Sequence, residues 1–494
     1  MPGTVDGEDR PEARVRAETR DVYKTLDLAL RIGELLLSSG AGAADVGATM
    51  LNVARSCGLR TATADVTFTE LAMSHQSRAD EPALIQLRQV RYRVIDYEDL
   101  TLVDHLVRDL LDEQITSEEA TTRLARIVSS GHRRPRWAVT IGNGFLGGGI
   151  GLLVGGSGPV ALLAAGVAMG IDLIQQRMSH SRWPVFYQQV AGGLFATLIA
   201  VFTAATGAHT PPSVVVTAGI ILLLAGVSFM GAIQDALTGF PLTAGARILE
   251  ALLATAGIIA GVSGGLTIGA LLGAGVGRLD PGQVTLSDLP LMALGAAIAS
   301  AAFAFASYAP LRTLVPVALV GALAETVQSL ARERGVGTAW SSASAAVLIG
   351  LVSYAVAGRV RVPPLVVVVP TVVPLLPGLA IYRGLSLLSD GHPASAGAGI
   401  LSIVNAATIA IALAAGVIFG SYLAQPLKRE AHRLENRLAG PRLVGPLRSA
   451  KVRRRAHRVA HPSLRRPAPA SAPRSRTDPR AAPPEQPPGP RPHP

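Results

Sequence analysis

Long apolar runs recur through the middle of this chain, and each is close to the length that crosses a lipid bilayer. A transmembrane helix needs about 20 mostly apolar residues. Shorter stretches that carry glycine, proline or arginine separate the runs. The pattern predicts ten membrane-spanning helices, over residues 137–156, 159–174, 185–205, 214–233, 248–276, 289–308, 314–330, 339–357, 365–382 and 400–422.

Charge is rare in the same part of the chain. Residues 137–427 hold only 18 Asp, Glu, Lys and Arg side chains and no lysine, whereas the 136 residues before them hold 40. A water-soluble fold of that size would expose far more charge on its surface. We therefore predict an α-helical polytopic membrane protein, preceded by a small soluble domain and followed by a polar tail.

The soluble part is patterned as an α+β domain over residues 21–136. Residues 1–20 are polar and mixed in charge, and we predict that they are disordered. They contain no apolar core of the kind that marks a signal peptide, so the domain is expected in the cytoplasm. Its apolar residues recur with helical spacing over 21–37, 44–57, 100–111 and 117–128 and favour strands over 63–73 and 84–95.

The tail over residues 428–494 carries the basic charge of the protein. It holds 17 Lys and Arg against 4 Asp and Glu, and 14 of its last 64 residues are proline, which predicts disorder. A basic segment beside a membrane helix is typical of the cytoplasmic face. Nucleic acid is not expected as a partner, because no aromatic residues are interleaved with the arginines.

The arginines in the short loops predict the orientation of the helices. With the N-terminus in the cytoplasm, four loop arginines lie outside, and both termini lie inside because the span number is even. Nine then lie on the inner side: Arg133, Arg134, Arg136, Arg177, Arg182, Arg247, Arg312, Arg359 and Arg361.

Ten spans divide into two halves of five, over residues 137–277 and 278–427. An odd number of spans in each half would invert the second half relative to the first, which is a common transporter architecture. Asp235 to Arg247 and Val373 to Arg383 both combine glycine, proline and a following arginine at corresponding spans. We predict a 5+5 inverted repeat.

A few ionisable residues lie within or near the spans, where each is expensive to place. Asp172 and Asp235 are near the inner ends of the second and fourth spans, and Glu325 follows an apolar run in the seventh. Arg247 and Glu250 are one helical turn apart and are expected to share a face. These residues are candidates for a substrate or proton pathway; the alternative is that they are hydrated at the membrane interface.

The ninth span is rich in proline. Pro370, Pro374 and Pro377 would each remove a backbone donor, so we predict a broken or strongly kinked helix over residues 369–378, which include Gly378. Backbone freed in this way needs a partner or a water-filled cavity, which makes the segment a candidate binding site; an inert kink is the alternative. Two amides inside other spans, Asn143 and Asn405, either contact a substrate or join helices.

Other features of the sequence give weaker indications of function. The glycines over residues 147–151 favour close helix packing rather than a phosphate loop, and the lone Cys57 cannot build a metal or redox site. No cofactor or metal is predicted, and we do not expect an enzyme. The soluble domain does offer hydrolase-like residue types in Asp65, Thr67, Thr69, Glu70, Ser74 and His75, although no nucleophile elbow or zinc spacing accompanies them.

The layout resembles the bacterial threonine/serine exporter family over about residues 20–425. The resemblance rests on the motifs that begin at Ser38 and Asp65 in the soluble domain, Asp235-Ala-Leu-Thr-Gly239 with Arg247 and Glu250, and Pro374-Leu-Leu-Pro-Gly378 with Tyr382-Arg383. It implies export of threonine and serine across the bacterial plasma membrane, driven by the proton gradient or the membrane potential. Where family members often carry Val-Glu, this chain has Val46-Gly47.

The sequence therefore predicts a secondary exporter of small amino acids. A zwitterion needs an acceptor for its ammonium, such as Asp235, Glu250 or Glu325, and a donor for its carboxylate, such as Arg247 or amides at the broken span. Expected partners are threonine, serine, protons and the lipid bilayer, and a homo-oligomer is left open. Three alternatives stay open: a dicarboxylate exporter of the same fold, a membrane-anchored hydrolase using residues 21–136, and a passive channel.

Overall fold

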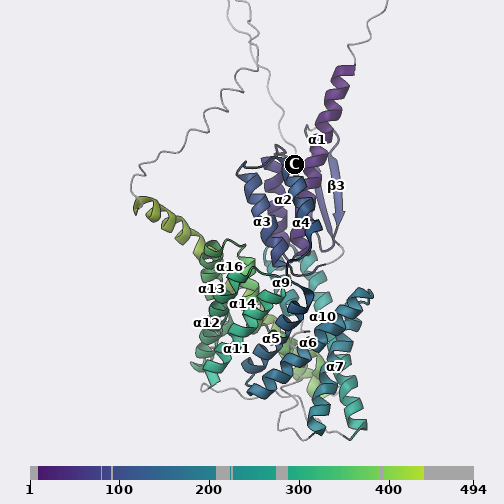
Figure 1. Cartoon of the computed structure of the whole chain (residues 1–494), viewed down its shortest axis with the longest axis vertical. Coiled ribbons are helices and arrows are strands. Elements are labelled where there is room, and N and C mark those ends of the chain that lie inside the picture. Colours follow the sequence, from purple (N-terminus) through teal and green to yellow (C-terminus); the bar gives the residue numbers. More distant parts are fainter. Residues whose placement is uncertain are drawn as a thin grey trace, which may run out of the picture. The chain divides into compact units, whose positions relative to one another are not determined.

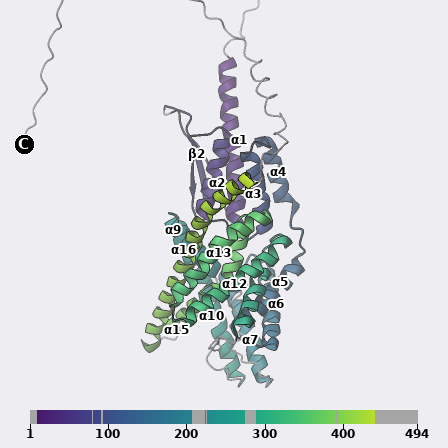
Figure 2. The same cartoon turned by 90° about the vertical axis from the view of Figure 1, so that its left-hand side faces the viewer.

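The N-terminal elements of the protein lie at one end of its larger unit, and the membrane helices lie at the other (Figures 1 and 2). This unit comprises residues 1–431. The computed structural model describes residues 9–78, 80–90, 93–206, 223, 226–273, 288–389 and 393–438. Several predicted features lie outside the described residues: residues 1–8 of the N-terminus, the start of the fourth span except for residue 223, the end of the fifth span, and most of the basic tail.

The N-terminal domain begins with a longer helix than expected. Helix α1 spans Asp9–Ser38, so the prediction of disorder is wrong for residues 9–20. Glu, Arg and Ala dominate this stretch and have high helix propensity. Pro11 lies in the first turn, where its missing N–H has no partner to lose. The second half of α1 buries a row of leucines that includes Leu26, Leu30 and Leu37.

A three-stranded antiparallel sheet, in the order β1–β2–β3, completes the domain with three more helices. The predicted strand over 63–73 is two strands, because Thr67 N–H donates to Glu70 O at 2.9 Å and closes a turn. The predicted strand over 84–95 ends early. The elements are α2 (Ala43–Ser56), β1 (Thr63–Val66), β2 (Glu70–His75), β3 (Leu84–Gln89), α3 (Tyr97–Leu111) and α4 (Ser117–Ser130).

The membrane region is helical throughout the part that the structure describes. Seven of these helices are long and apolar enough to cross a bilayer. Of the three other predicted spans, α5 and α14–α15 coincide with the first and the ninth, and α9 overlaps the end of the fourth. The protein is therefore a polytopic helical membrane protein, and ten spans remain a prediction. The helices are α5 (Arg136–Leu153), α6 (Gly158–His180), α7 (Val185–Ala205), α9 (Gly226–Leu237), α10 (Pro241–Leu271), α11 (Leu289–Ala306), α12 (Leu314–Glu333), α13 (Thr338–Val360), α14 (Leu365–Val372), α15 (Gly378–Ser389) and α16 (Pro393–Leu438).

Glycines bring several of these helices into close contact. A Cβ added at Gly147 would lie 2.9 Å from Ala164 O in α6, and one at Gly149 would lie 2.8 Å from Ala299 N in α11. Neither position can hold a larger residue without moving backbone. The glycine-rich run of α5 is therefore a packing surface, as predicted, because small residues let membrane helices approach closely.

The predicted break in the ninth span is present. Helix α14 ends at Val372 and continues as one 3-10 turn, η3 (Val373–Leu375). Leu376 is then extended, with ψ of 140°, before α15 begins at Gly378. Proline at 370, 374 and 377 removes three helix donors close together in the sequence, which explains why the chain cannot run through this segment as one helix.

The N-terminal domain packs directly on the ends of the membrane helices. One hydrophobic core joins α1–α4 to residues of α11, α12, α13 and α14, including Ala304, Val317 and Val366. Tyr97 N–H donates to Ser307 O at 2.9 Å. We call the helix ends that contact the domain the domain side of the membrane region.

Candidate functional site

Asp235 and Arg247 form a buried ion pair on the domain side. Asp235, near the end of α9, is 1% exposed. Arg247 lies near the start of α10, with its Nη1 2.8 Å from Asp235 Oδ2. Phe240 N–H donates to Asp235 O at 2.8 Å, and Gly239 has a φ of +96° that favours glycine. This tight turn brings the two charges face to face.

Sequence spacing places Arg247 on the same face as Glu250, but the ion pair forms with Asp235. Glu250 is exposed, and the described residues contain no ion pair between it and Arg247. A buried carboxylate without a cation costs several kcal/mol, whereas an exposed one is hydrated. The guanidinium is therefore better placed beside Asp235.

The N-terminal domain reaches the same carboxylate. Ala43 N–H, at the first position of α2, donates to Asp235 Oδ1 at 3.0 Å. The N-cap of α2 is Gly42, which has no side chain to cap the helix. Asp235 therefore caps α2 from a distant part of the sequence, and the partial positive charge of the helix N-terminus favours it.

Further contacts fix the domain around this point. Thr243, in the first turn of α10, donates through Oγ1 to Val66 O at 3.5 Å. Asp45 is exposed at the surface of α2. The surrounding protein removes part of the hydration of its carboxyl, and this desolvation, followed by repulsion from Asp235, raises the pKa of that carboxyl. Asp45 also acts electrostatically on Tyr354 of α13. Asp45 is thus an exposed carboxylate of α2 that lies close enough to Asp235 and Tyr354 to act on both electrostatically.

Arg93 adds a second cation to this site. Its guanidinium lies 4.3 Å from the centre of the Phe68 ring, and Nη2 donates to Phe68 O. Burial, followed by repulsion from Arg247, lowers its pKa to about 10, while Asp235 and Glu250 act in the opposite direction. Arg93 therefore stays charged near neutral pH. The alternating apolar residues around Arg93 predict a strand, and the sequence gives no signal that this arginine belongs to a site.

Asp172 forms a separate cluster between α5 and α6. It is 6% exposed, so the alternative of a hydrated interfacial residue is wrong. Arg136 Nη2 and Asn143 Nδ2 donate to Oδ1 at 2.7 and 2.8 Å, and Thr140 Oγ1 donates to Oδ2 at 2.6 Å. The charge of Asp172 is fully compensated, and Asn143 joins helices.

Glu325 is buried without a cation. It lies in α12, is 3% exposed and accepts a hydrogen bond from Ser329 Oγ at 2.9 Å. Among the described residues no Lys, Arg or His lies within ion-pair distance of it. Asp172 and Asp235 each have an arginine, so Glu325 differs from both.

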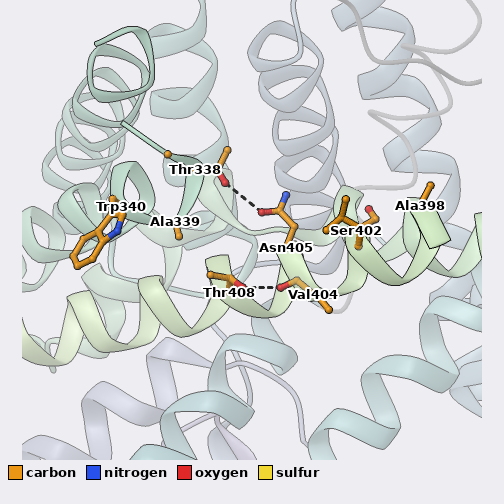
Figure 3. Close-up of a pocket in the computed structure, with 10 residues that line it drawn as sticks. Thr338, Ala339, Trp340, Ala398, Ser402, Val404, Asn405 and Thr408 are labelled. Atoms are coloured by element: carbon orange, nitrogen blue, oxygen red, sulfur yellow. Dashed lines mark hydrogen bonds between the residues drawn. The ribbon is translucent and has the colours of Figure 1, made fainter. Parts of the chain in front are cut away.

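Asn405 lies elsewhere, in a pocket of about 670 Å³ between the start of α13 and α16 (Figure 3). Its Oδ1 accepts a hydrogen bond from Thr338 Oγ1 at 3.2 Å. Trp340, which lines the same pocket, is 76% exposed.

The break before α15, which contains Pro374 and Pro377 and ends at Gly378, is also separate from the charged groups. It contacts the start of α9, where a Cβ at Gly226 would lie 3.0 Å from Leu376 Cβ.

The hydrolase-like residues of the domain are not brought together. Glu70 begins β2 and His75 ends it, so their Cα atoms are about 17 Å apart. His75 Nδ1 shares a hydrogen bond with Thr61 Oγ1 at 3.0 Å, and Ser74 Oγ shares one with Thr63 at 2.7 Å. Among the residues that the structure describes, no three or more His, Cys, Asp or Glu side chains form a cluster that could hold a metal ion.

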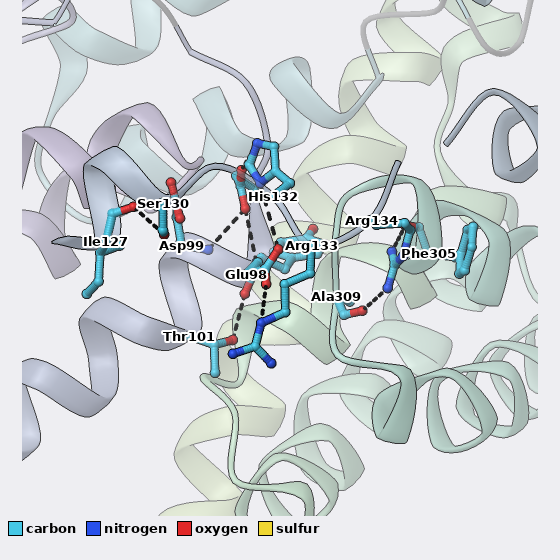
Figure 4. A network of polar contacts seen from close by, with 12 residues as sticks. Glu98, Asp99, Thr101, Ile127, Ser130, His132, Arg133, Arg134, Phe305 and Ala309 are labelled. Atoms are coloured by element: carbon cyan, nitrogen blue, oxygen red, sulfur yellow. Dashed lines mark hydrogen bonds and ion pairs between the residues drawn. The ribbon is translucent and has the colours of Figure 1, made fainter. Parts of the chain in front are cut away.

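A polar network holds the segment that joins the domain to α5 (Figure 4). His132 Nε2 lies 3.2 Å from Asp96 Oδ2, and its ring stacks on Tyr308 at 3.9 Å. Arg134 donates to Phe305 O and to Ala309 O. Burial, followed by the charge of Asp96, raises the pKa of Asp99 to about 6. The network therefore contains a carboxyl that titrates near neutral pH.

Most of the chain is similar in sequence to known proteins. A family model described as "Putative threonine/serine exporter" matches residues 27–269, and one described as "Threonine/Serine exporter, ThrE" matches residues 292–423. The "Probable threonine/serine exporter" of Mycobacterium tuberculosis (strain ATCC 25618 / H37Rv) is 33% identical over 428 residues, 85% of this chain and 80% of that protein. The "Threonine/serine exporter" of Corynebacterium glutamicum is 29% identical over 414 residues, 83% of this chain and 84% of that protein. No solved structure matches.

Proposed function

The chain belongs to the threonine/serine exporter family, and we propose that it exports threonine, serine and similar small amino acids from the cytoplasm as a secondary carrier. The buried Asp235–Arg247 pair is the observation that carries this proposal. Charged groups inside a helical membrane region are costly and mark transport pathways. A zwitterionic amino acid brings one charge of each sign, so it can bind beside such a pair without adding net charge to the site.

The proton gradient drives export in this proposal, and Glu325 carries the proton. Asp172 and Asp235 are each held by an arginine, so protonation of either would leave a cation without its partner. Among the described residues, Glu325 has a hydrogen bond only from Ser329 and a longer-range electrostatic interaction with Arg332, but no ion pair. Its protonation therefore removes a buried charge rather than exposing one.

Two inverted halves of five spans are part of the same proposal. The packing of the first half supports it: α5 contacts α6, α7 contacts α10, and α9 contacts α10. The second half shows the matching contacts: α11 with α12, α13 with α16 and α15 with α16. Asp172 and Glu325 then lie in the second helix of each half, on opposite sides of the membrane.

We propose that the protein lies in the bacterial plasma membrane with both termini in the cytoplasm. The excess of arginine in the loops of the domain side supports this orientation. Cytoplasmic amino acids would then enter where the N-terminal domain packs on Asp235, and the pocket at Asn405 would face outward. The domain serves transport here and has no hydrolase role.

Counterflow in proteoliposomes tests the function. Vesicles with the full-length protein, preloaded with unlabelled threonine, should accumulate radiolabelled threonine and serine, and Asp235→Asn should abolish this accumulation at equal protein content. Uphill accumulation separates a carrier from a channel. Uptake of succinate without threonine or serine would instead establish the dicarboxylate alternative, and no accumulation of any of the three would reject the proposal.

A further inference from the structure

We propose that Arg93 of the N-terminal domain binds the α-carboxylate of the transported amino acid at its cytoplasmic entry site, an inference that rests on the proposed function. The membrane region alone would then hold only part of this site. The N-terminal domain would supply the guanidinium, and the α9–α10 turn would supply the carboxylate of Asp235.

Arg93 is held in place before any ligand arrives. Stacking on the Phe68 ring fixes the plane of its guanidinium, and the hydrogen bond from Nη2 to Phe68 O fixes its direction. A guanidinium restrained in this way loses little side-chain entropy when it binds a ligand. Arginine also presents a planar pair of donors that matches the two oxygens of a carboxylate.

One nitrogen of the restrained Arg93 guanidinium is still available to donate a hydrogen bond. Arg93 Nη1 is buried and has no hydrogen-bond partner among the described residues. Arg88 of β3 behaves differently, because it pairs with both Asp27 and Glu34. An unsatisfied donor on a charged group costs free energy, and a bound carboxylate would satisfy it.

The charges around Arg93 are those that a zwitterion requires. Arg93 interacts electrostatically with Arg247, Asp235 and Glu250. Arg247 is already neutralised by Asp235, so Arg93 is the cation left for a carboxylate. Asp235 Oδ2 lies close to Arg247 but accepts no aligned hydrogen bond, and it can therefore receive an ammonium.

The test compares threonine with 1-amino-2-propanol, which is threonine without its carboxylate. Both compete against radiolabelled threonine or serine in proteoliposomes that contain the full-length protein. For Arg93→Gln we expect the affinity for threonine to fall about 10- to 100-fold and that for the amino alcohol to stay the same. Arg93→Lys keeps the positive charge but lacks the planar pair of donors, so its affinity for threonine should lie between those of the wild type and Arg93→Gln.

Arg60 is exposed in the same domain, so Arg60→Gln is the matched control and should behave like the wild type. The inference is overturned if Arg93→Gln binds threonine normally, or if it weakens both competitors equally, as a folding defect would. If the wild type carries succinate but neither threonine nor serine, the proposed function fails. Loss of succinate uptake in Arg93→Gln would then still support the role of Arg93, and normal uptake would reject it.

Discussion

The backbone N–H of Ala43 donates a hydrogen bond to the side chain of Asp235, although 192 positions separate them in the sequence. Asp235 is thereby shared between a helix of the soluble domain and an arginine of the membrane region. The contact couples two parts of the protein that could each be expected to fold around their own core. Its removal is therefore the most direct test of how the domain acts on transport.

Ala43→Pro removes this one hydrogen bond, because proline has no N–H and fits the first position of a helix. Gly42 already has the extended conformation that precedes proline, with φ of −69° and ψ of 151°. We expect faster hydrogen exchange in the α9–α10 turn and a docking loss of about 1.5–3 kcal/mol. Ala43→Val adds similar volume and keeps the N–H; equal exchange in the two variants would show that the contact contributes nothing.

The Asp235–Arg247 pair should show strong coupling in a double-mutant cycle. Either Asp235→Asn or Arg247→Gln leaves one buried charge alone, which costs about 3–5 kcal/mol. The double variant removes both charges and should recover much of that stability, measured as thermal unfolding in detergent. Transport should stay absent in all three. Additive losses in the double variant would contradict the pairing.

Glu325→Gln should separate exchange from proton coupling. Because the substituted amide cannot titrate, a pH gradient should no longer drive accumulation, while threonine counterflow continues. Asp172→Asn should behave differently, because it weakens the pairing of Arg136 and lowers the unfolding temperature without changing the coupling. Measurement of both activities on the same vesicles provides the comparison. Gradient-driven accumulation in Glu325→Gln at the wild-type rate would exclude Glu325 as the proton carrier.

Asp99 should make the domain less stable as the pH rises. Its pKa is raised to about 6 in the folded protein, whereas an unfolded aspartate titrates near 4. The folded state therefore holds the proton more tightly, and stability falls between pH ~4 and pH ~6 and is level above. Asp99→Asn removes this slope. We expect the variant to unfold about 2 °C higher than the wild type at pH 7.5 and at an equal temperature near pH 4.

The glycines of α10 provide a matched packing test. A Cβ at Gly261 would lie 2.8 Å from Leu194 N in α7, whereas one at Gly264 would have no atom within 4 Å. Gly261→Ala should therefore destabilise the protein by about 1–3 kcal/mol. Gly264→Ala should leave stability unchanged or raise it slightly, because alanine has the higher helix propensity. A similar unfolding temperature for the two variants would argue against close packing of α7 and α10.

Much of the architecture follows from local signals in the sequence. The apolar runs and the low charge predict the membrane helices, and the third predicted span matches the bounds of α7. The prolines predict the break before Gly378 because each acts on its own turn of helix. Local signals fail where charge alone suggested disorder, as in residues 9–20, which form the start of α1.

The site was less predictable, because its contacts join distant parts of the chain. Helical spacing relates Arg247 to Glu250, but it contains no information about the turn that brings Asp235 to Arg247. The partners of Asp172 lie on another helix, and Arg93 approaches Asp235 only after the domain has packed on the membrane region. Burial and long-range packing decide these contacts, and neither has a periodic signature.

Helix α4 ends at Ser130 and α5 begins at Arg136, so the connecting peptide is very short. Five peptide residues, even when pulled straight, reach only about 18 Å. A released domain would therefore stay near the entry site at an effective concentration in the millimolar range. An isolated copy of the domain added to solution should therefore compete poorly with this tethered one.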